Sequence, residues 1–179
     1  MTRLTALTLL GFQAVWLVCA WSAAHGRTVQ AVAVCCAYAV IAVGLSRDRV
    51  PAARLAALSA ALGMVVESLL IGLGILIHVT TWPSPLIAPA WLIALWMAYG
   101  ATVPATRKLL GTRARLKSVL AGAIFGPLAY VAGGALGALT IVQPALPAIL
   151  TIALLWSATQ LLLFSVGREL DARQDRCRG

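Results

Sequence analysis

The chain has 179 residues, of which 61% are hydrophobic and 11% are charged, and its mean hydropathy is +0.95. An ordinary soluble domain is about 45–50% apolar and about 25% charged, and a chain of this length could not bury so much apolar surface in water. The composition therefore excludes a soluble globular enzyme. It also excludes a disordered chain, which needs low hydrophobicity, and it predicts an integral membrane protein.

The charge balance is strongly basic, with 14 Lys and Arg against 5 Asp and Glu and a net charge of +9. The basic residues lie in short segments between long apolar runs, a pattern typical of contact with anionic lipid headgroups rather than with nucleic acid. The cysteines show no metal-ligand spacing, so we expect no metal, no cofactor and no disulfide. Three of them lie inside apolar runs and one near the C-terminus: Cys19, Cys35, Cys36 and Cys177.

Six apolar runs reach or approach the length of about 20 residues that a membrane-spanning helix needs. They cover residues 4–24, 28–45, 55–79, 86–106, 116–139 and 144–166. The runs do not alternate between apolar and polar residues, which excludes a β-barrel, and only helices then satisfy every backbone group in lipid. The sequence predicts an all-α, polytopic membrane protein: one bundle of six transmembrane helices over residues 1–166, followed by a basic tail over residues 167–179.

The distribution of basic residues predicts the orientation of this bundle. Every Lys and Arg except Arg27 lies before the first run, after the last run, in the second and fourth connections, or, for Lys117, at the start of the fifth run beside the fourth connection. Because cytoplasmic loops carry the excess of Lys and Arg, we expect both termini in the cytoplasm. All connections are short, so any chemistry must use intramembrane side chains or loop residues.

Glu67 is the only acidic residue within a predicted span, and it lies roughly 18 Å from either end of the run 55–79. An ionised carboxylate is costly there, so a partner is expected. Two interpretations of Glu67 remain open: an acid with a function, or a protonated group whose hydrogen bond to a neighbouring helix stabilises the bundle. At helical spacing, Ser59, Gly63 and Glu67 share a face with His78, which would lie about three turns further on. Two interpretations of His78 also remain open: an interfacial histidine without a further role, or the start of a proton path to Glu67.

Neutral polar side chains on other runs are candidate partners of this carboxyl. Gln13 lies near the middle of the first run, and Tyr99 and Tyr130 lie on runs that reach the same depth. Trp96 lies too deep for an interfacial belt, so its N–H needs an internal partner. We predict a polar cluster of Glu67, Gln13, Tyr99, Tyr130 and Trp96. Its side chains either pack the helices together or form the wall of a pocket, and the sequence leaves both roles open.

The fifth run, 116–139, carries two G-x-x-x-G pairs, Gly122/Gly126 and Gly133/Gly137. Small residues at this spacing let two helices approach closely. Pro127 cannot donate a backbone hydrogen bond and is expected to kink the helix at its centre. We therefore expect this helix to pack tightly against a neighbour.

Four segments of the chain carry a resemblance to a known family: Phe12-Gln13-Ala14-Val15-Trp16, Gly63 with Glu67, Pro89-Ala90-Trp91-Leu92-Ile93-Ala94-Leu95-Trp96 and Gly126-Pro127-Leu128-Ala129-Tyr130-Val131-Ala132-Gly133. Together they resemble a bacterial inner-membrane family catalogued as domain of unknown function 2878. The family usually has Asp at the acidic position, so Glu67 is a departure. The resemblance implies location in the inner membrane but no established activity. Members encoded near lipid-modifying enzymes imply a role in lipid metabolism.

The candidate residues and the family resemblance together leave three functions open. The first is an accessory protein of membrane-lipid metabolism, with membrane lipids and enzymes of lipid metabolism as candidate partners. The second is a small proton-coupled transporter that uses Glu67, and the third is an intramembrane lipid-modifying enzyme. A cavity that reaches Glu67 from both sides would favour transport. A pocket open sideways to lipid would favour an enzyme, and a tightly packed Glu67 would favour an accessory or structural role. The sequence does not set the oligomeric state.

Overall fold

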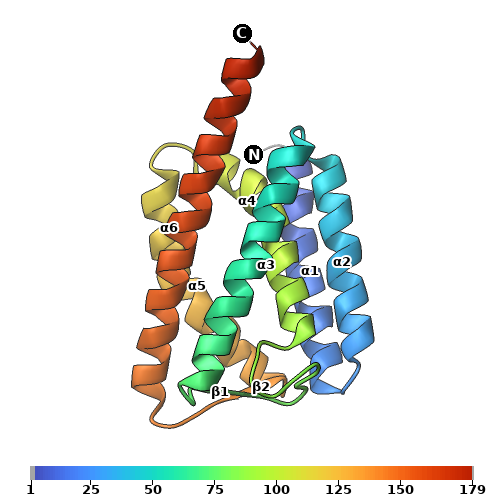
Figure 1. Ribbon diagram of the computed structural model, residues 1–179, viewed down its shortest axis with the longest axis vertical. Helices are drawn as coiled ribbons and strands as arrows, with labels where there is room; N and C mark the ends of the chain where they lie inside the picture. The colour runs from blue at the N-terminus through green and yellow to red at the C-terminus, as the bar shows by residue number, and fades with distance from the viewer. Residues whose placement is uncertain (1–2, 179) are drawn as a thin grey trace.

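The computed structural model describes residues 3–178, which form a bundle of six helices closed at one end by two short strands (Figure 1). The elements in chain order are α1 (Arg3–Ala24), α2 (Thr28–Leu45), α3 (Arg49–Gly72), β1 (Leu76–His78), α4 (Ala90–Leu110), α5 (Ala114–Ala135), β2 (Leu139–Ile141) and α6 (Ala145–Arg178). The all-α expectation is thus met apart from the two strands, which the apolar runs did not predict.

The two ends of the bundle differ in charge. Both ends of the chain and the connections after α2 and α4 lie at the end drawn at the top of Figure 1, and we call this the basic end. The two strands and the connection after α1 lie at the opposite end, which we call the strand end. Arg27 is the one Lys or Arg of residues 3–178 at the strand end. The helix order therefore separates the charges as the sequence predicts.

Five of the six described helices are long and apolar enough to cross a membrane: α1, α2, α3, α5 and the segment Ala145–Gln174 of α6. Their outward side chains are apolar, for example Leu7 at 67% exposed and Leu154 at 71%. In a soluble protein such a continuous apolar surface is rare, whereas lipid accepts it. This arrangement is that of a membrane protein.

Helix α4 is the exception, and its place in the bundle explains why. It packs against α1, α2, α3 and α6, and more lightly against α5. Ten of its residues are buried, among them Trp91, Trp96 and Gly100. A helix enclosed by other helices needs small and polar side chains for packing and hydrogen bonding rather than a uniformly apolar surface.

The runs 55–79 and 116–139 were expected to be helical throughout, and this is wrong at their ends. Helix α3 stops at Gly72 and α5 stops at Ala135. Gly74 and Gly137 follow with φ of +67° and +81°, a conformation that favours glycine and ends a helix. At the first of these ends, the N–H of Ile75 donates to the carbonyl of Leu70, which closes the turn.

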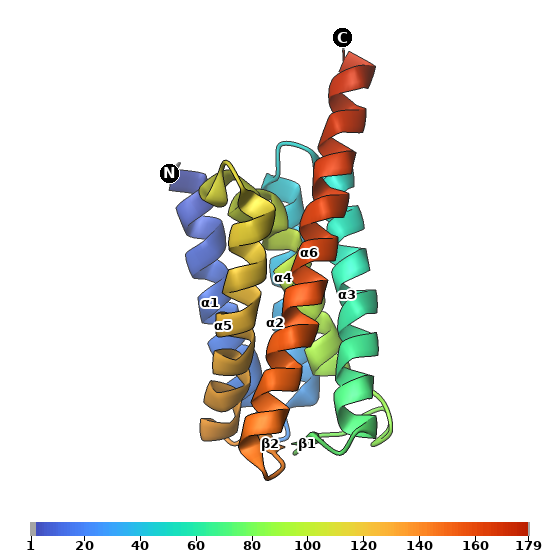
Figure 2. The same cartoon turned by 90° about the vertical axis from the view of Figure 1, so that its left-hand side faces the viewer.

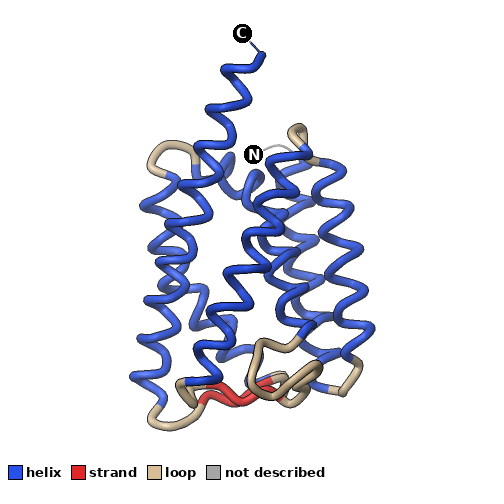
Figure 3. The backbone as a smooth tube through the Cα atoms, viewed as in Figure 1, coloured by secondary structure: helices blue, strands red, loops and turns tan. Residues whose placement is uncertain are grey.

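After each of these turns the chain forms a strand, and β1 pairs antiparallel with β2 across the strand end (Figure 3). Leu76 lies opposite Ile141, and His78 lies opposite Leu139. Side chains alternate along a strand, so Leu76 and His78 face inward and are buried, whereas Ile77 is 61% exposed. The pair of strands therefore covers the bundle and carries a histidine into it.

Helix α6 continues to Arg178, well past residue 166 where the last span was expected to end, and it extends beyond the other helices at the basic end (Figure 2). Arg107 of α4 forms an ion pair with this extension of α6, with Nη1 2.8 Å from Asp171 Oδ2. The Arg107 side chain also lies against Gly167, where a Cβ atom would be 2.9 Å from Nη1.

Candidate functional site

Glu67 is fully buried, with no exposed surface. Because α3 ends at Gly72, Glu67 lies five residues from that end, or about 7 Å along the helix axis. The expectation that it lies twelve residues from each end of its helix is therefore wrong. The error came from extending the helix through Gly72 and Gly74.

Two donors converge on one oxygen of this carboxyl. The indole Nε1 of Trp96 donates to Glu67 Oε1 at 2.9 Å, and the Tyr130 hydroxyl donates a short hydrogen bond to the same oxygen. Trp156 Nε1 lies 3.4 Å from the Tyr130 hydroxyl and donates to it. Side chains from α3, α4, α5 and α6 thus form one hydrogen-bonded chain.

The other oxygen, Oε2, faces the strand end. His78 Nε2 lies 3.9 Å from it, and both side chains are buried. The sequence placed His78 about three turns away because it treated residues 73–79 as helix. Gly72 and Gly74 were the signal that could have placed it correctly, since closely spaced glycines at the end of an apolar run indicate a helix stop.

Two stacked tryptophans form the centre of the site. The rings of Trp96 and Trp156 have centroids 4.5 Å apart, and each ring lies over a glycine of a neighbouring helix. A Cβ atom on Gly63 would be 2.1 Å from Trp96 Cγ, and one on Gly126 would be 2.5 Å from Trp156 Cγ. These glycines leave the space that the indoles fill. Trp156 was not included in the predicted cluster.

Tyr99 belongs to a second hydrogen-bonded group, nearer the basic end. The amide nitrogen of Gln160 donates a short hydrogen bond to the Tyr99 hydroxyl, while the amide oxygen of Gln160 is buried and has no partner among the described residues. The Tyr99 ring packs against Phe12 of α1, with centroids 5.7 Å apart. Gln160, like Trp156, was outside the predicted cluster.

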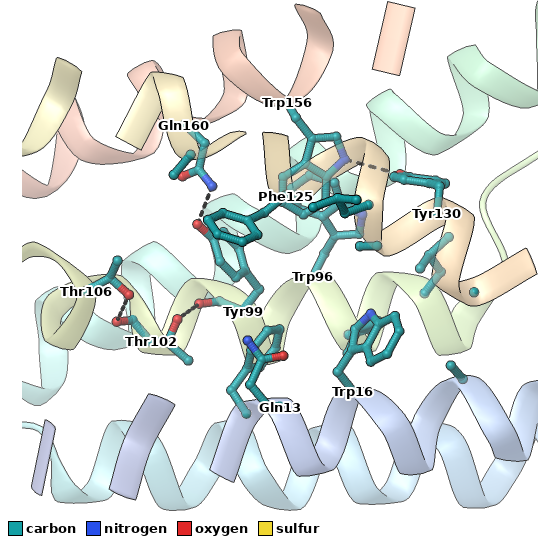
Figure 4. A pocket seen from close by; sticks show the side chains of 18 of the residues that line it. Gln13, Trp16, Trp96, Tyr99, Thr102, Thr106, Phe125, Tyr130, Trp156 and Gln160 are labelled. Atoms are coloured by element: carbon teal, nitrogen blue, oxygen red, sulfur yellow. Dashed lines mark hydrogen bonds between the residues drawn. The ribbon is translucent and has the colours of Figure 1, made fainter. Parts of the chain in front are cut away.

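Of the five residues in the predicted cluster, the structure brings Glu67, Trp96 and Tyr130 into direct hydrogen bonding. Tyr99 joins them through ring contacts with Trp96 and Trp156. Gln13 is exposed and lies on the wall formed by α1, across from Tyr99 (Figure 4). It lines the same cavity without joining the hydrogen bonds to Glu67.

These side chains line a cleft of about 550 Å³ between α1 and α5, with α4 as its floor and α6 behind it (Figure 4). Along α4 the lining runs from Trp91 to Leu110, a length of roughly 28 Å. On the α5 wall, Phe125 and Leu128 are 66% and 54% exposed. The cleft therefore opens sideways, between two helices that are apolar enough to span a membrane.

The two glycine pairs of α5 have different roles. A Cβ atom at Gly122 would be 2.7 Å from Gln160 Cγ, and Gly126 is equally close to Trp156, so this pair packs tightly against α6. At Gly133 the nearest atom would be 3.4 Å away, an ordinary contact, and Gly137 lies beyond the helix end. The expectation of close helix packing at the second pair is wrong. Pro127 is buried inside α5, which continues past it to Ala135.

Within residues 3–178, no group of three His, Cys, Asp or Glu side chains is placed to hold a metal ion. What the site offers is one buried carboxyl, one buried imidazole, two tyrosine hydroxyls and amide groups around an apolar cleft. Such a set can bind by shape and hydrogen bonding, and it can transfer protons.

Comparison with known proteins confirms the family resemblance. The family described as "Protein of unknown function (DUF2878)" matches residues 5–162, nearly the whole bundle. No curated protein and no solved structure matches the chain.

Proposed function

Because the chain belongs to the DUF2878 family, whose function is unknown, we propose a function from the geometry of its own site. The protein is a polytopic protein of the bacterial inner membrane that takes one acyl chain of a phospholipid into the cleft between α1 and α5. In this way it serves membrane-lipid metabolism as an accessory, lipid-binding component. The sideways opening of the apolar cleft carries the lipid-binding part of this proposal, and the tight packing of Glu67, which has no exposed surface, favours the accessory role over an enzyme.

In the proposed topology all six helices cross the membrane, including α4 at the centre, and both termini are cytoplasmic. The basic end then faces the cytoplasm, in agreement with the positive-inside rule. Arg27 is the one Lys or Arg of residues 3–178 that lies on the outer side. Fusion of alkaline phosphatase after Gly179 tests this orientation. We expect an inactive fusion at that point and an active one in the connection at Arg27, and the reverse pattern would overturn the orientation.

The dimensions of the cleft support an acyl chain as the ligand. Its length of roughly 28 Å exceeds the share of one leaflet, about 15 Å of the hydrocarbon core of about 30 Å, so the cleft is long enough for one extended acyl chain. Its walls are mostly aliphatic and aromatic, from Leu9 on α1 to Phe164 on α6. An extended chain can slide in from the bilayer between α1 and α5 without leaving an apolar environment.

The basic end of the cleft supports a phosphate headgroup. Leu110 and Ser118 line the cleft there and flank the connection between α4 and α5. That connection and the first turn of α5 carry the exposed side chains of Arg113, Arg115 and Lys117. Basic residues beside a membrane helix attract anionic lipid, so we expect phosphatidylglycerol to bind better than phosphatidylcholine.

Native mass spectrometry of the purified protein tests lipid binding. Ala129 lies on the α5 wall of the cleft, and Ala129→Trp would fill the space that the chain occupies. We expect this variant to lose at least about tenfold in affinity for phosphatidylglycerol, equivalent to about 1.4 kcal/mol. The matched control is Ala33→Trp, because Ala33 is exposed on α2, away from the cleft. Equal lipid binding by wild type and Ala129→Trp would overturn the proposal.

An intramembrane lipid-modifying enzyme is the second candidate, because the cleft opens sideways and Glu67 is among the residues that line it. Lipid profiles of a deletion strain separate the two. For an enzyme, a class of acyl chain should disappear and Glu67→Gln should fail to restore it. For an accessory protein, Glu67→Gln should restore the wild-type profile. A carrier is a weaker proposal, since it would need Glu67 to be reachable from both sides.

A further inference from the structure

The buried group nearest to the free oxygen of Glu67 is an imidazole that the proposed lipid site does not use. His78 comes from β1, and its Nε2 lies 3.9 Å from Glu67 Oε2. This separation is too long for a hydrogen bond, but one water or a small side-chain rotation closes it. His78 is only 5% exposed.

Unpaired polar atoms gather at this point. Glu67 Oε2, both ring nitrogens of His78 and Trp91 Nε1 are buried and have no hydrogen-bond partner among the described residues. The rings of His78 and Trp91 meet edge to face, with centroids 5.9 Å apart. Buried polar groups are nearly always paired, and an internal water commonly bridges those that no protein group reaches.

The hydrogen bonds determine where a proton on Glu67 must be. Trp96 Nε1 is a donor only, so Glu67 Oε1 accepts from it at 2.9 Å, and it also accepts from Tyr130. With Oε1 occupied as an acceptor, the carboxyl proton can lie only on Oε2, which faces His78. The Oε1 side is closed by the two donors.

The charged and titratable groups around Glu67 and His78 favour an arrangement in which both side chains are neutral. Besides Glu67, the titratable group beside the pair is Tyr130 of α5, while α4 contributes the uncharged Trp91 and Trp96. Among the described residues no Lys or Arg forms an ion pair with Glu67. Burial lowers the pKa of His78 to about 4, so at neutral pH the imidazole is uncharged and can accept a proton.

We infer that Glu67 and His78 form a proton-sharing pair, and that His78 is the group through which the Glu67 carboxyl exchanges its proton with the strand end. The Oε2–H bond breaks as the proton passes to Nε2, directly or through one water, which gives a carboxylate and an imidazolium. The imidazolium then releases its Nδ1 proton to a water that reaches this buried nitrogen from the strand end. The reverse steps return a proton to Oε2, so charge and atoms balance.

The position of His78 in the strand supports this route. Its neighbours in sequence, Ile77 and Val79, are 61% and 59% exposed, so the backbone at His78 lies at the surface of the strand end, while the buried His78 side chain points inward. His78 therefore stands between the carboxyl and the water outside. Lipid in the cleft is not required for this exchange, so the inference is independent of the proposed function.

Infrared spectroscopy of the purified protein tests the pair. The C=O stretching band of the protonated Glu67 carboxyl is assigned as the band that Glu67→Gln removes, and its shift in D₂O reports the rate of proton exchange. We expect His78→Phe, which keeps a ring but no nitrogen, to slow this shift at least about tenfold. His25→Phe is the matched control, because His25 lies exposed at the same end of the bundle and its loss should leave the rate unchanged.

His78→Gln is a second variant, which can hydrogen-bond but cannot become a cation, and it should also slow exchange if His78→Phe does not fold. Exchange as fast as in wild type in either folded variant would overturn the route through His78. A wild-type spectrum at pH 7 without a band that Glu67→Gln removes would overturn the placement of the proton on Oε2.

Discussion

Trp96 of α4 and Trp156 of α6 stack with their ring centroids 4.5 Å apart, and each indole occupies the space above a glycine of the adjacent helix. Gly63 of α3 lies beneath Trp96 and Gly126 of α5 lies beneath Trp156. Four helices are thus joined at one point, next to Glu67 and the cleft. The site therefore depends on these two glycines, which have no side chain, as much as on the tryptophans that fill the space above them.

Adding one methyl group beneath either indole should destabilise the bundle. Gly126→Ala and Gly63→Ala would place Cβ within 2.5 and 2.1 Å of ring atoms, and such overpacking costs about 1–3 kcal/mol or more. Thermal unfolding in detergent measures the loss. The control is Gly44→Ala in α2, where no atom lies within 4 Å. Gly133→Ala should also be mild, and equal stability of all four variants would contradict the packing described.

Replacement of Glu67 separates its hydrogen bonds from its proton. Glu67→Gln keeps an oxygen that accepts from Trp96 and Tyr130, so the variant should fold with near-normal stability. Glu67→Leu leaves both buried donors unpaired and should lose about 1–2 kcal/mol, the scale of hydrogen bonds inside membrane proteins. A Leu variant as stable as wild type in the same unfolding assay would show that these bonds contribute little.

Acid should destabilise the protein through His78. Its pKa is lowered from 6.5 to about 4 by burial, so between these pH values the unfolded chain binds a proton that the folded chain does not. Stability conferred by the neutral imidazole is therefore complete above pH 6.5 and is lost as pH falls towards 4, by up to roughly 3 kcal/mol. Unfolding temperatures at pH 7 and pH 4.5 measure this loss. His78→Phe should reduce the difference between them, whereas His25→Phe should not.

The ion pair between Arg107 and Asp171 should matter little by itself. The Asp171 side chain is 57% exposed, and exposed pairs contribute about 0–1 kcal/mol. Asp171→Asn should therefore shift the unfolding temperature only slightly, and less at high salt. Gly167→Leu is the contrasting change, because a side chain there would displace Arg107. A large loss of stability in Asp171→Asn would show that the extension of α6 depends on the charge.

The sequence by itself determined the class of protein, the six helices, the shared end of the two termini and the need of the acid on α3 for hydrogen-bond partners. Composition and run length decide these properties because lipid allows only helices with satisfied backbones and apolar exteriors. Trp96 and Tyr130 could be proposed as partners of Glu67 because a buried indole or phenol needs a hydrogen-bond partner.

Only the tertiary structure decided where each helix stops and what its faces meet. Residues 73–77 are still apolar, so hydropathy predicts that the helix continues to the end of the run. In the structure the positive φ of Gly74 turns the chain, and β1 brings His78 back to within 3.9 Å of Glu67. The pairing of β1 with β2 joins segments about sixty residues apart, and no local pattern encodes that. The cleft likewise arises from the spacing of α1 and α5, which is set by the packing of α1 against α2 and α4 and of α5 against α6.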